Sequence, residues 1–297
     1  MALVGSTASG KSAVAMAVAR TLGDVDLVSI DSMQVYRGMD VGTAKPTPAE
    51  RAEVPHHLLD LVDPSDDFTV ADFKAAYEPA ISAIATAGRR ALLVGGTGLH
   101  HRVVIDDFDL PGQWPEVRAE LNAELDTVAL HARLAALDPT AAAKMEPSNR
   151  RRVVRALEVT IGSGRPFSSF GPGVDDYPAT AVTQIGLRWP REVVAGRIAA
   201  RVHQMVADGL VAEVAALEAA GGFSRTAAQA LGYKETLDAL AGRISEDEAI
   251  DRIILRTRQF AVRQERWFRR DPRVRWIDIE HDPVAEAAGV VVEAFDT

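Results

Sequence analysis

The stretch that most restricts the fold of this chain is its N-terminal glycine loop, which matches the phosphate-binding pattern G-x-x-x-x-G-K-[ST]. An apolar, strand-like segment at residues 2–4 precedes the loop, and a helical Ala/Val/Met pattern at residues 12–22 follows it. This arrangement directs several backbone N–H groups and a helix N-terminus at one anion. We predict a di- or triphosphate site, in which Lys11 reaches the outer phosphate and the Ser12 hydroxyl binds Mg²⁺. The predicted loop consists of Gly5, Ser6, Thr7, Ala8, Ser9, Gly10, Lys11 and Ser12.

Composition excludes several classes of protein. The net charge of −9 over 297 residues argues against a general nucleic-acid binder, so any nucleic acid must meet a local basic patch. The absence of cysteine excludes disulfides and thiolate metal sites. No apolar run reaches the roughly 18 residues that a membrane span requires, and no secretory signal is visible. We therefore expect a cytoplasmic protein with no membrane contact.

The order of predicted elements indicates an α/β fold. Further strands are expected at 26–30, 91–94, 181–187 and 274–279, with helices between them. Residues 112–178 show short helical patterns separated by Pro and Gly, without a clear strand. We predict a P-loop-type core, a parallel sheet flanked by helices at 1–111 and 179–297, and a small all-helical insertion domain at 112–178.

Asp31 follows the strand at 26–30. Residues at the carboxyl ends of parallel strands face the ligand crevice, which places Asp31 near the bound phosphates. The strand at 91–94 ends in Gly-Gly-Thr-Gly, where a nucleotide triphosphatase usually has a metal-binding aspartate. Asp31 is therefore expected to help the metal or to act as a base, with a helix N-cap as the structural alternative. The polar loop at 32–46 is typical of a binding surface. His56 and His57 point to opposite sides of an extended chain, so a metal site there is not favoured.

Two arginine clusters stand out against the acidic background. Residues 150–155 contain four arginines at the start of a predicted helix, where cations oppose the helix dipole. Residues 251–276 contain nine arginines and three acidic residues, and five of these arginines form one stripe of a helix. A bound polyanion explains both clusters, and a merely solvated helix face is the alternative in each case. Ile253, Phe260 and Trp267 are expected to face the core beside the stripe.

Six segments carry a resemblance to a known family: residues 5–12, 31–46, 55–60, 95–99, 155–159 and 258–267. In this order they resemble the tRNA isopentenyltransferase family of bacterial tRNA dimethylallyltransferases. The segment Asp-Ser-Met-Gln-Val-Tyr-Arg-Gly-Met-Asp-Val-Gly-Thr-Ala-Lys-Pro at 31–46 is far more specific than the phosphate loop. The chain departs from the family pattern at Ser6, His100, Gln229 and Val262.

The resemblance implies transfer of a dimethylallyl group from dimethylallyl diphosphate to N6 of the adenosine 3′ of the tRNA anticodon. It implies that the phosphate loop holds the diphosphate leaving group with Mg²⁺. We expect the enzyme to be a monomer. By family position Asp31 is the base, and Arg201 and Thr7 are the diphosphate-stabilising catalytic residues. The implied tRNA-binding positions are Asp31, Ser32, Met33, Gln34, Thr97, Arg118, Arg151, Arg152, Val153, Val154, Arg155, Gln229, Ala230, Leu231, Gly232, Tyr233 and Lys234.

Three other functions stay open at this point. A small-molecule kinase could use the same loop for ATP, with Asp31 as base for a hydroxyl group. A non-catalytic RNA-binding protein could retain the loop as a relic. An adenylate isopentenyltransferase could prenylate free AMP, although that enzyme would not need the arginine helix.

Overall fold

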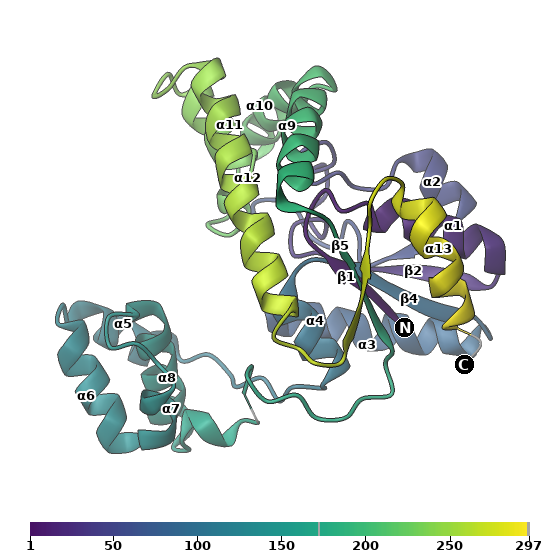
Figure 1. Cartoon of the computed structure of the whole chain (residues 1–297). Helices are drawn as coiled ribbons and strands as arrows, with labels where there is room; N and C mark the ends of the chain where they lie inside the picture. The colour runs from purple at the N-terminus through teal and green to yellow at the C-terminus, as the bar shows by residue number, and fades with distance from the viewer. Residues whose placement is uncertain (172, 296–297) are drawn as a thin grey trace. The chain divides into compact units, whose positions relative to one another are not determined.

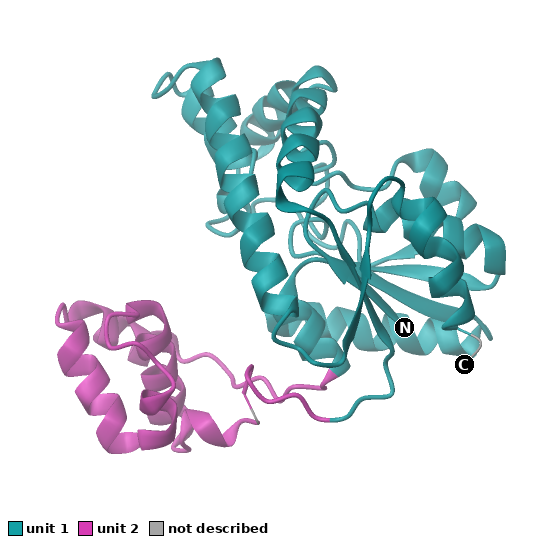
Figure 2. Ribbon diagram, in the orientation of Figure 1, with its two compact units in different colours: residues 1–105, 179–297 teal, residues 106–178 magenta. Residues whose placement is uncertain are grey.

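The computed structural model describes residues 1–171 and 173–295, which divide into two compact units (Figure 2). Unit 1 comprises residues 1–105 and 179–297, and unit 2 comprises residues 106–178. The sequence placed the first boundary at 111/112, whereas unit 2 begins at Asp106, directly after the last helix before the insertion. No helix within the described ranges is both long and apolar enough to cross a membrane.

Unit 1 is built on a six-stranded sheet in the order β3-β2-β4-β1-β5-β6, in which every pairing is parallel (Figure 1). The strands are β1 (Ala2–Gly5), β2 (Val25–Ile30), β3 (His56–His57), β4 (Arg90–Gly95), β5 (Gln184–Arg188) and β6 (Val274–Asp278). The apolar β1 strand lies fully buried between β4 and β5. A buried parallel sheet must be covered by helices on both faces, and this architecture confirms the predicted α/β core.

Helices cover both faces of this sheet. Those of unit 1 are α1 (Lys11–Leu22), α2 (Pro48–Glu53), α3 (Val70–Thr86), α4 (Gly98–Ile105), α9 (Arg191–Ala207), α10 (Leu210–Ala220), α11 (Tyr233–Leu240), α12 (Glu246–Phe268) and α13 (Pro283–Glu293). A short 3₁₀ turn, η2 (Ala227–Gln229), precedes α11. Leu3 packs in the cluster under α1 and α13, whereas Ala2 packs in the opposite cluster, as the two-residue period of a strand requires.

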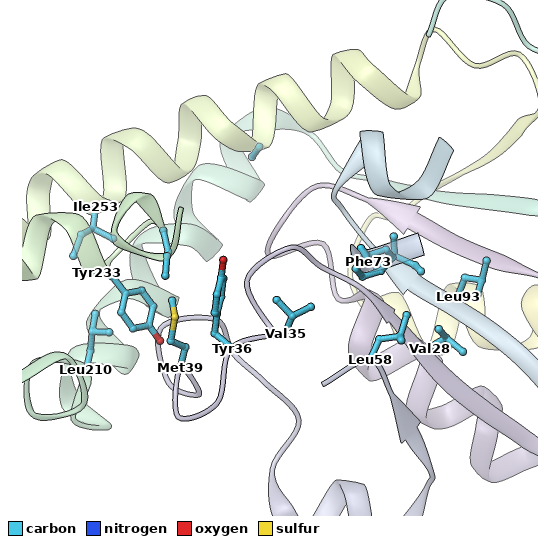
Figure 3. Close-up of a cluster of buried hydrophobic side chains, with 14 of the residues drawn as sticks. Val28, Val35, Tyr36, Met39, Leu58, Phe73, Leu93, Leu210, Tyr233 and Ile253 are labelled. Carbon is cyan, nitrogen blue, oxygen red and sulfur yellow. The ribbon is translucent and has the colours of Figure 1, made fainter. Parts of the chain in front are cut away.

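The larger hydrophobic cluster joins the sheet to the arginine helix and its neighbours (Figure 3). It runs from Val28 and Leu93 on the strands, through Val35, Tyr36 and Met39 of the 32–46 loop, to Tyr233 and Ile253. The polar loop therefore buries several apolar side chains, which the sequence interpretation as a pure surface loop did not foresee. This burial fixes the loop against the core and holds the tip of β2 in place.

Several short elements were missing from the sequence prediction. These are α2, α4, α11 and the two-residue strand β3. They are too short to show a periodic pattern, and tertiary contacts hold them in place. At β3, His57 Nε2 lies 2.8 Å from Asp26 Oδ2 and His56 Nδ1 lies 2.7 Å from the Val54 carbonyl, consistent with a structural role for both imidazoles.

Unit 2 is a helical bundle of α5 (Pro115–Ala123), α6 (Thr127–Leu137), α7 (Pro139–Ala143) and α8 (Arg150–Ser163), followed by the 3₁₀ turn η1 (Phe167–Ser169). Its core joins Leu121, Leu134, Val153 and Leu157. Arg150, at the start of α8, donates to the carbonyls that end α5, at 3.2 Å for Leu121 and 3.1 Å for Asn122. This guanidinium caps a neighbouring helix, which explains a cation at a helix N-terminus without any bound anion.

His100 on α4 is half-buried with its Nδ1 atom buried, and its ring lies edge-on to Phe73 at 4.7 Å between centroids. Burial lowers the pKa of His100 to about 4. Between pH 6.5 and 4 the unfolded chain then binds more protons, so stability falls as the pH falls, by up to about 1.4 kcal/mol per pH unit.

The free energy of unfolding should fall between pH 7 and pH 4.5 in wild type. We expect this fall to be about 2 kcal/mol smaller in His100→Phe, because phenylalanine takes up no proton. Urea unfolding at both pH values measures this difference. His203→Phe, at an exposed histidine, is the control. Equal pH profiles for His100→Phe and wild type would show that His100 is not the buried neutral group.

Candidate functional site

The candidate site is a cavity of about 810 Å³ within unit 1. The phosphate loop, the ends of β2 and β4, the middle of α9, residues 229–232 and the inner face of α12 line it. Because the carboxyl ends of parallel strands form the ligand crevice in open α/β sheets, the sheet topology alone places a site here. Asp31, Thr97 and Arg201, predicted from distant parts of the sequence, all line this one cavity.

Three side chains, one of them from the loop itself, hold the phosphate loop in shape by donating to its carbonyl groups. Lys11 Nζ donates to the Ser6 carbonyl at 2.7 Å, and Arg197 Nε donates to the Ala8 carbonyl at 2.8 Å. The Trp189 indole donates to the Ser9 carbonyl at 2.9 Å. The Ser9 hydroxyl is buried and, among the described residues, finds no hydrogen-bond partner. Such an orphaned donor in a phosphate loop fits a bound anion.

Lys11, Arg201 and Asp31 interact electrostatically within the cavity. Burial, followed by repulsion from Arg201, lowers the pKa of Lys11 to about 7, and Asp31 opposes this shift. Burial also lowers the pKa of Arg201, again against the attraction of Asp31. The two cations lie close enough to repel each other in a desolvated pocket, so an anion placed between them is stabilised.

Asp31 is intermediate in exposure at the tip of β2. Its Oδ1 accepts from the Met33 amide at 2.8 Å and so closes a local turn. The next helix, α2, begins only at Pro48, so Asp31 is not the helix N-cap that the structural alternative predicted. The backbone amide of Ser32, which directly follows Asp31, donates to Thr97 Oγ1 at 3.3 Å. This hydrogen bond links the carboxyl ends of β2 and β4. One carboxylate oxygen fixes the orientation of Asp31, which lines the cavity.

Hydrogen bonds and ion pairs to nearby residues hold the rest of the 31–46 segment in place. Gln34 accepts from Ser29 Oγ at 2.7 Å and donates to the carbonyls of Thr43 and Ala44, at 3.2 and 3.3 Å. The buried Lys45 ammonium lies 2.6 Å from both Asp40 and Asp60. Gln34 was predicted to contact tRNA, but its side-chain amide is already occupied by bonds that shape the loop.

The tip of β4 carries no acidic side chain, as the sequence indicated. A Cβ added at Gly95 would lie 2.1 Å from the Ile30 carbonyl oxygen, which leaves no room for an aspartate there. Within residues 1–171 and 173–295 no group of three or more His, Cys, Asp or Glu side chains could hold a metal ion.

In unit 2 the predicted tRNA-contacting residues have different environments. Val153 and Val154 are buried in the bundle core, so their side chains hold the helix rather than face a ligand. Glu158, which is fully buried, bonds Arg118 Nε at 2.9 Å and lies 3.2 Å from Arg155 Nη1. Arg151 and Arg152 are exposed on the first turn of α8.

The residues of segment 229–234, which were predicted to contact tRNA, also have different environments. Gln229, Ala230, Leu231 and Gly232 line the cavity, whereas Tyr233 is buried. The Tyr233 hydroxyl donates to Glu213 at 2.5 Å, and burial next to this carboxylate raises the pKa of the phenol. Tyr233 therefore supports the site from behind, and Lys234 is outside the cavity lining.

The arginine stripe of α12 is partly neutralised within the chain. Arg256 lies 2.5 Å from the buried Glu235, and Arg252 lies 2.6 Å from Glu248. Arg263 lines the cavity and packs over the Phe260 ring at 5.7 Å. Of the residues expected to face the core, Ile253 is buried, whereas Phe260 and Trp267 are half-buried.

Two polar residues of the cavity were not assigned from the sequence. Arg197 lies one helical turn before Arg201 and bonds the phosphate loop; the shared helix face was visible, but its direction was not. Gln264 lies on α12 and accepts from the Thr7 amide at 2.8 Å. Gln264 is one of two glutamines on this arginine-rich helix, and its sequence context gives no local signal of such a contact.

Comparison with known proteins agrees with this geometry. A family model described as IPP transferase matches residues 34–271, and one described as isopentenyl transferase matches residues 1–65. A tRNA dimethylallyltransferase of Kineococcus radiotolerans is 52% identical over 93% of this chain and 90% of the relative. The relative of the same name from Thermobifida fusca is 48% identical over 100% of this chain and 95% of its own length.

A solved structure shows the same fold. The full-length tRNA isopentenylpyrophosphate transferase of Bacillus halodurans superimposes with a TM-score of 0.71 at 40% identity, covering 99% of this chain and 96% of that one. The family model spans well over half of the chain, and the relatives match it nearly end to end. The chain therefore belongs to the IPP transferase family, to which the tRNA dimethylallyltransferases belong.

Proposed function

We propose that this enzyme transfers a dimethylallyl group from dimethylallyl diphosphate to N6 of the adenosine 3′ of the anticodon in tRNA and releases diphosphate. The observation that carries the proposal is the single cavity in which the phosphate loop, Arg201 and Asp31 meet. The names of the relatives specify tRNA, which supports neither a small-molecule kinase nor an enzyme for free AMP.

The phosphate loop is suited to a leaving group that gains negative charge. When the bond between C1 of the prenyl group and the diphosphate oxygen breaks, its electron pair moves to the diphosphate. Lys11, Arg201 and the Thr7 hydroxyl are assigned to stabilise that charge, and the unpartnered Ser9 hydroxyl adds a donor. Preorganised donors in a desolvated pocket are effective because they need no reorganisation as the charge develops.

Magnesium is assigned to the same end of the cavity. Ser12, the second residue of α1, lines the cavity, while no cluster of three or more metal-binding side chains exists among the described residues. This donor set fits Mg²⁺, which usually keeps several waters and binds through one or two protein ligands plus substrate phosphates. When bound, the ion would neutralise part of the diphosphate charge.

Asp31 is assigned as the general base. The exocyclic amine of adenine is a weak nucleophile because its lone pair is delocalised into the ring. As the N6–C1 bond forms, the Asp31 carboxylate accepts the proton that N6 loses. A base in an unpaired anticodon loop can leave its stack at a cost of a few kcal/mol, which brings N6 to the carboxylate.

The tRNA surface is assigned to exposed cations in both units, including Arg151, Arg152 and Arg263. Every reacting group comes from one chain, so the proposal requires only a monomer. Its substrate, tRNA, is a cytoplasmic molecule, in agreement with the location expected from the sequence.

A transfer assay tests the proposed function. The enzyme is incubated with radiolabelled dimethylallyl diphosphate and Mg²⁺, with tRNA, AMP or no acceptor, and a parallel sample contains labelled ATP. We expect label on tRNA only. Label on AMP, or phosphate transfer from ATP without prenyl transfer, would contradict the proposal.

Arg263 and Arg256 should differ when each is replaced by alanine. Arg263 lacks an acidic partner within the described residues, so we expect Arg263→Ala to weaken binding of an anticodon stem-loop RNA. The slope of log Kd against the logarithm of the salt concentration should fall by about one, which corresponds to the loss of one phosphate contact. Arg256→Ala leaves the buried Glu235 unpaired, so its main effect should be a lower Tm. An unchanged salt slope for Arg263→Ala would assign that side chain to solubility.

A further inference from the structure

The side-chain amide of Gln264 on α12 joins three elements that are far apart in the sequence. Its Oε1 accepts from the Thr7 amide of the phosphate loop at 2.8 Å, and its Nε2 donates to the Gly96 carbonyl beyond β4 at 2.9 Å. The side chain is 7% exposed. Both ends of the amide are thus satisfied, and rotation of either bonded loop would leave a buried polar group unpaired.

The loop after β4 is shaped to receive α12. A Cβ at Gly96 would lie 2.3 Å from Gln264 Nε2, and a Cβ at Gly98 would lie 2.2 Å from Trp267. Two glycines of the Gly-Gly-Thr-Gly segment therefore make room for two side chains that are three residues apart on one face of the same helix. This close fit gives a physical reason for an acid-free segment that the sequence marked as unusual.

Gln264 also lies next to a residue that faces the ligand. Arg263 lines the cavity, and Arg266 is exposed further along the stripe. A nucleic acid that binds these arginines contacts α12, the same helix whose Gln264 accepts a hydrogen bond from the Thr7 amide. Because the Thr7 amide is bonded to Gln264, any shift of α12 toward or away from the RNA moves a diphosphate-binding residue with it.

We propose that Gln264 is a positioning residue that couples tRNA binding on α12 to the geometry of the diphosphate-binding loop through Thr7 and Gly96. The proposal rests on the proposed function and adds a reciprocal coupling between its two substrates. Such coupling between sites typically amounts to a 5- to 150-fold change in affinity and acts in both directions. A residue that only stabilised the fold would change stability and leave the ratio of the two affinities unaltered.

The experiment measures binding of inorganic diphosphate with Mg²⁺ by calorimetry, with and without a saturating anticodon stem-loop RNA. For wild type we expect at least about fivefold tighter diphosphate binding with RNA. Gln264→Met preserves length and apolar volume but removes both hydrogen bonds, and it should reduce this ratio to within twofold. Gln259→Met, at an exposed glutamine of the same helix, should keep the wild-type ratio.

Gly96→Ala perturbs the same contact from the other side, because its Cβ collides with the Gln264 amide. It should also reduce the ratio, so the test stands if Gln264→Met folds poorly. A wild-type ratio near one, or an unchanged ratio in either folded variant, would overturn the proposal, as would loss of folding in both. Failure of the proposed function is separate, since it appears as absent prenyl transfer by wild type.

Discussion

The Asp31→Asn enzyme should transfer dimethylallyl groups at least about a hundredfold more slowly than wild type, because general base catalysis contributes roughly 10²–10⁴ in rate. Asparagine keeps the shape of the side chain, and its Oδ1 can still accept from the Met33 amide, which Asp31 does at 2.8 Å. The turn at the end of β2 should therefore persist. An amide, however, cannot accept the proton that N6 loses.

The measurement for Asp31→Asn is single-turnover transfer at saturating tRNA, together with Kd for the anticodon stem-loop. We expect the Kd to change by no more than a few-fold, which separates chemistry from binding. Asp63→Asn is a suitable control, because Asp63 forms an exposed pair with Arg37 that contributes little to stability. Wild-type turnover by Asp31→Asn would remove Asp31 as the base.

Arg201→Met should lower kcat by about 10²–10³, the usual effect of removing one donor that stabilises developing charge. Arg201 is largely withdrawn from solvent, and burial lowers the pKa of its guanidinium, so its charge acts in a medium of low polarity. Methionine fills much of the same apolar volume without the charge. The pKa of Lys11 should rise in this variant, because Arg201 contributes to lowering it.

The Arg201→Met effect is checked by rapid-quench transfer with both substrates saturating. Arg191→Met, at an exposed position at the start of the same helix, is the matched control. The loss should appear in kcat more than in the KM for tRNA, since Arg201 is assigned to the leaving group. A kcat within threefold of wild type would assign the stabilising role to another cation of the cavity.

The arginine clusters show what charge patterns in a sequence can and cannot predict. Both clusters were visible as charge excess, and a polyanion partner was a reasonable interpretation of each. The structure separates their members. Arg150 caps α5, Arg155 pairs with the buried Glu158, and Arg256 pairs with Glu235. A charge count cannot make this distinction, because it does not show which side chains meet: Glu158 is one turn from Arg155 on α8, whereas tertiary packing brings Glu235 to Arg256.

The phosphate loop, the parallel α/β core, the helical insertion and the place of Asp31 at a strand end could be predicted, because these features depend on local patterns and on the fixed direction of parallel strands. The packed structure was needed to show that Gln34 is occupied within its loop and that Arg197 and Gln264 hold the phosphate loop. The contacts of Arg197 and Gln264 could not be predicted because their partners are far apart along the chain. Gln264 and Thr7 are 257 residues apart, and a hydrogen bond across that distance exists only after the sheet and α12 have packed together.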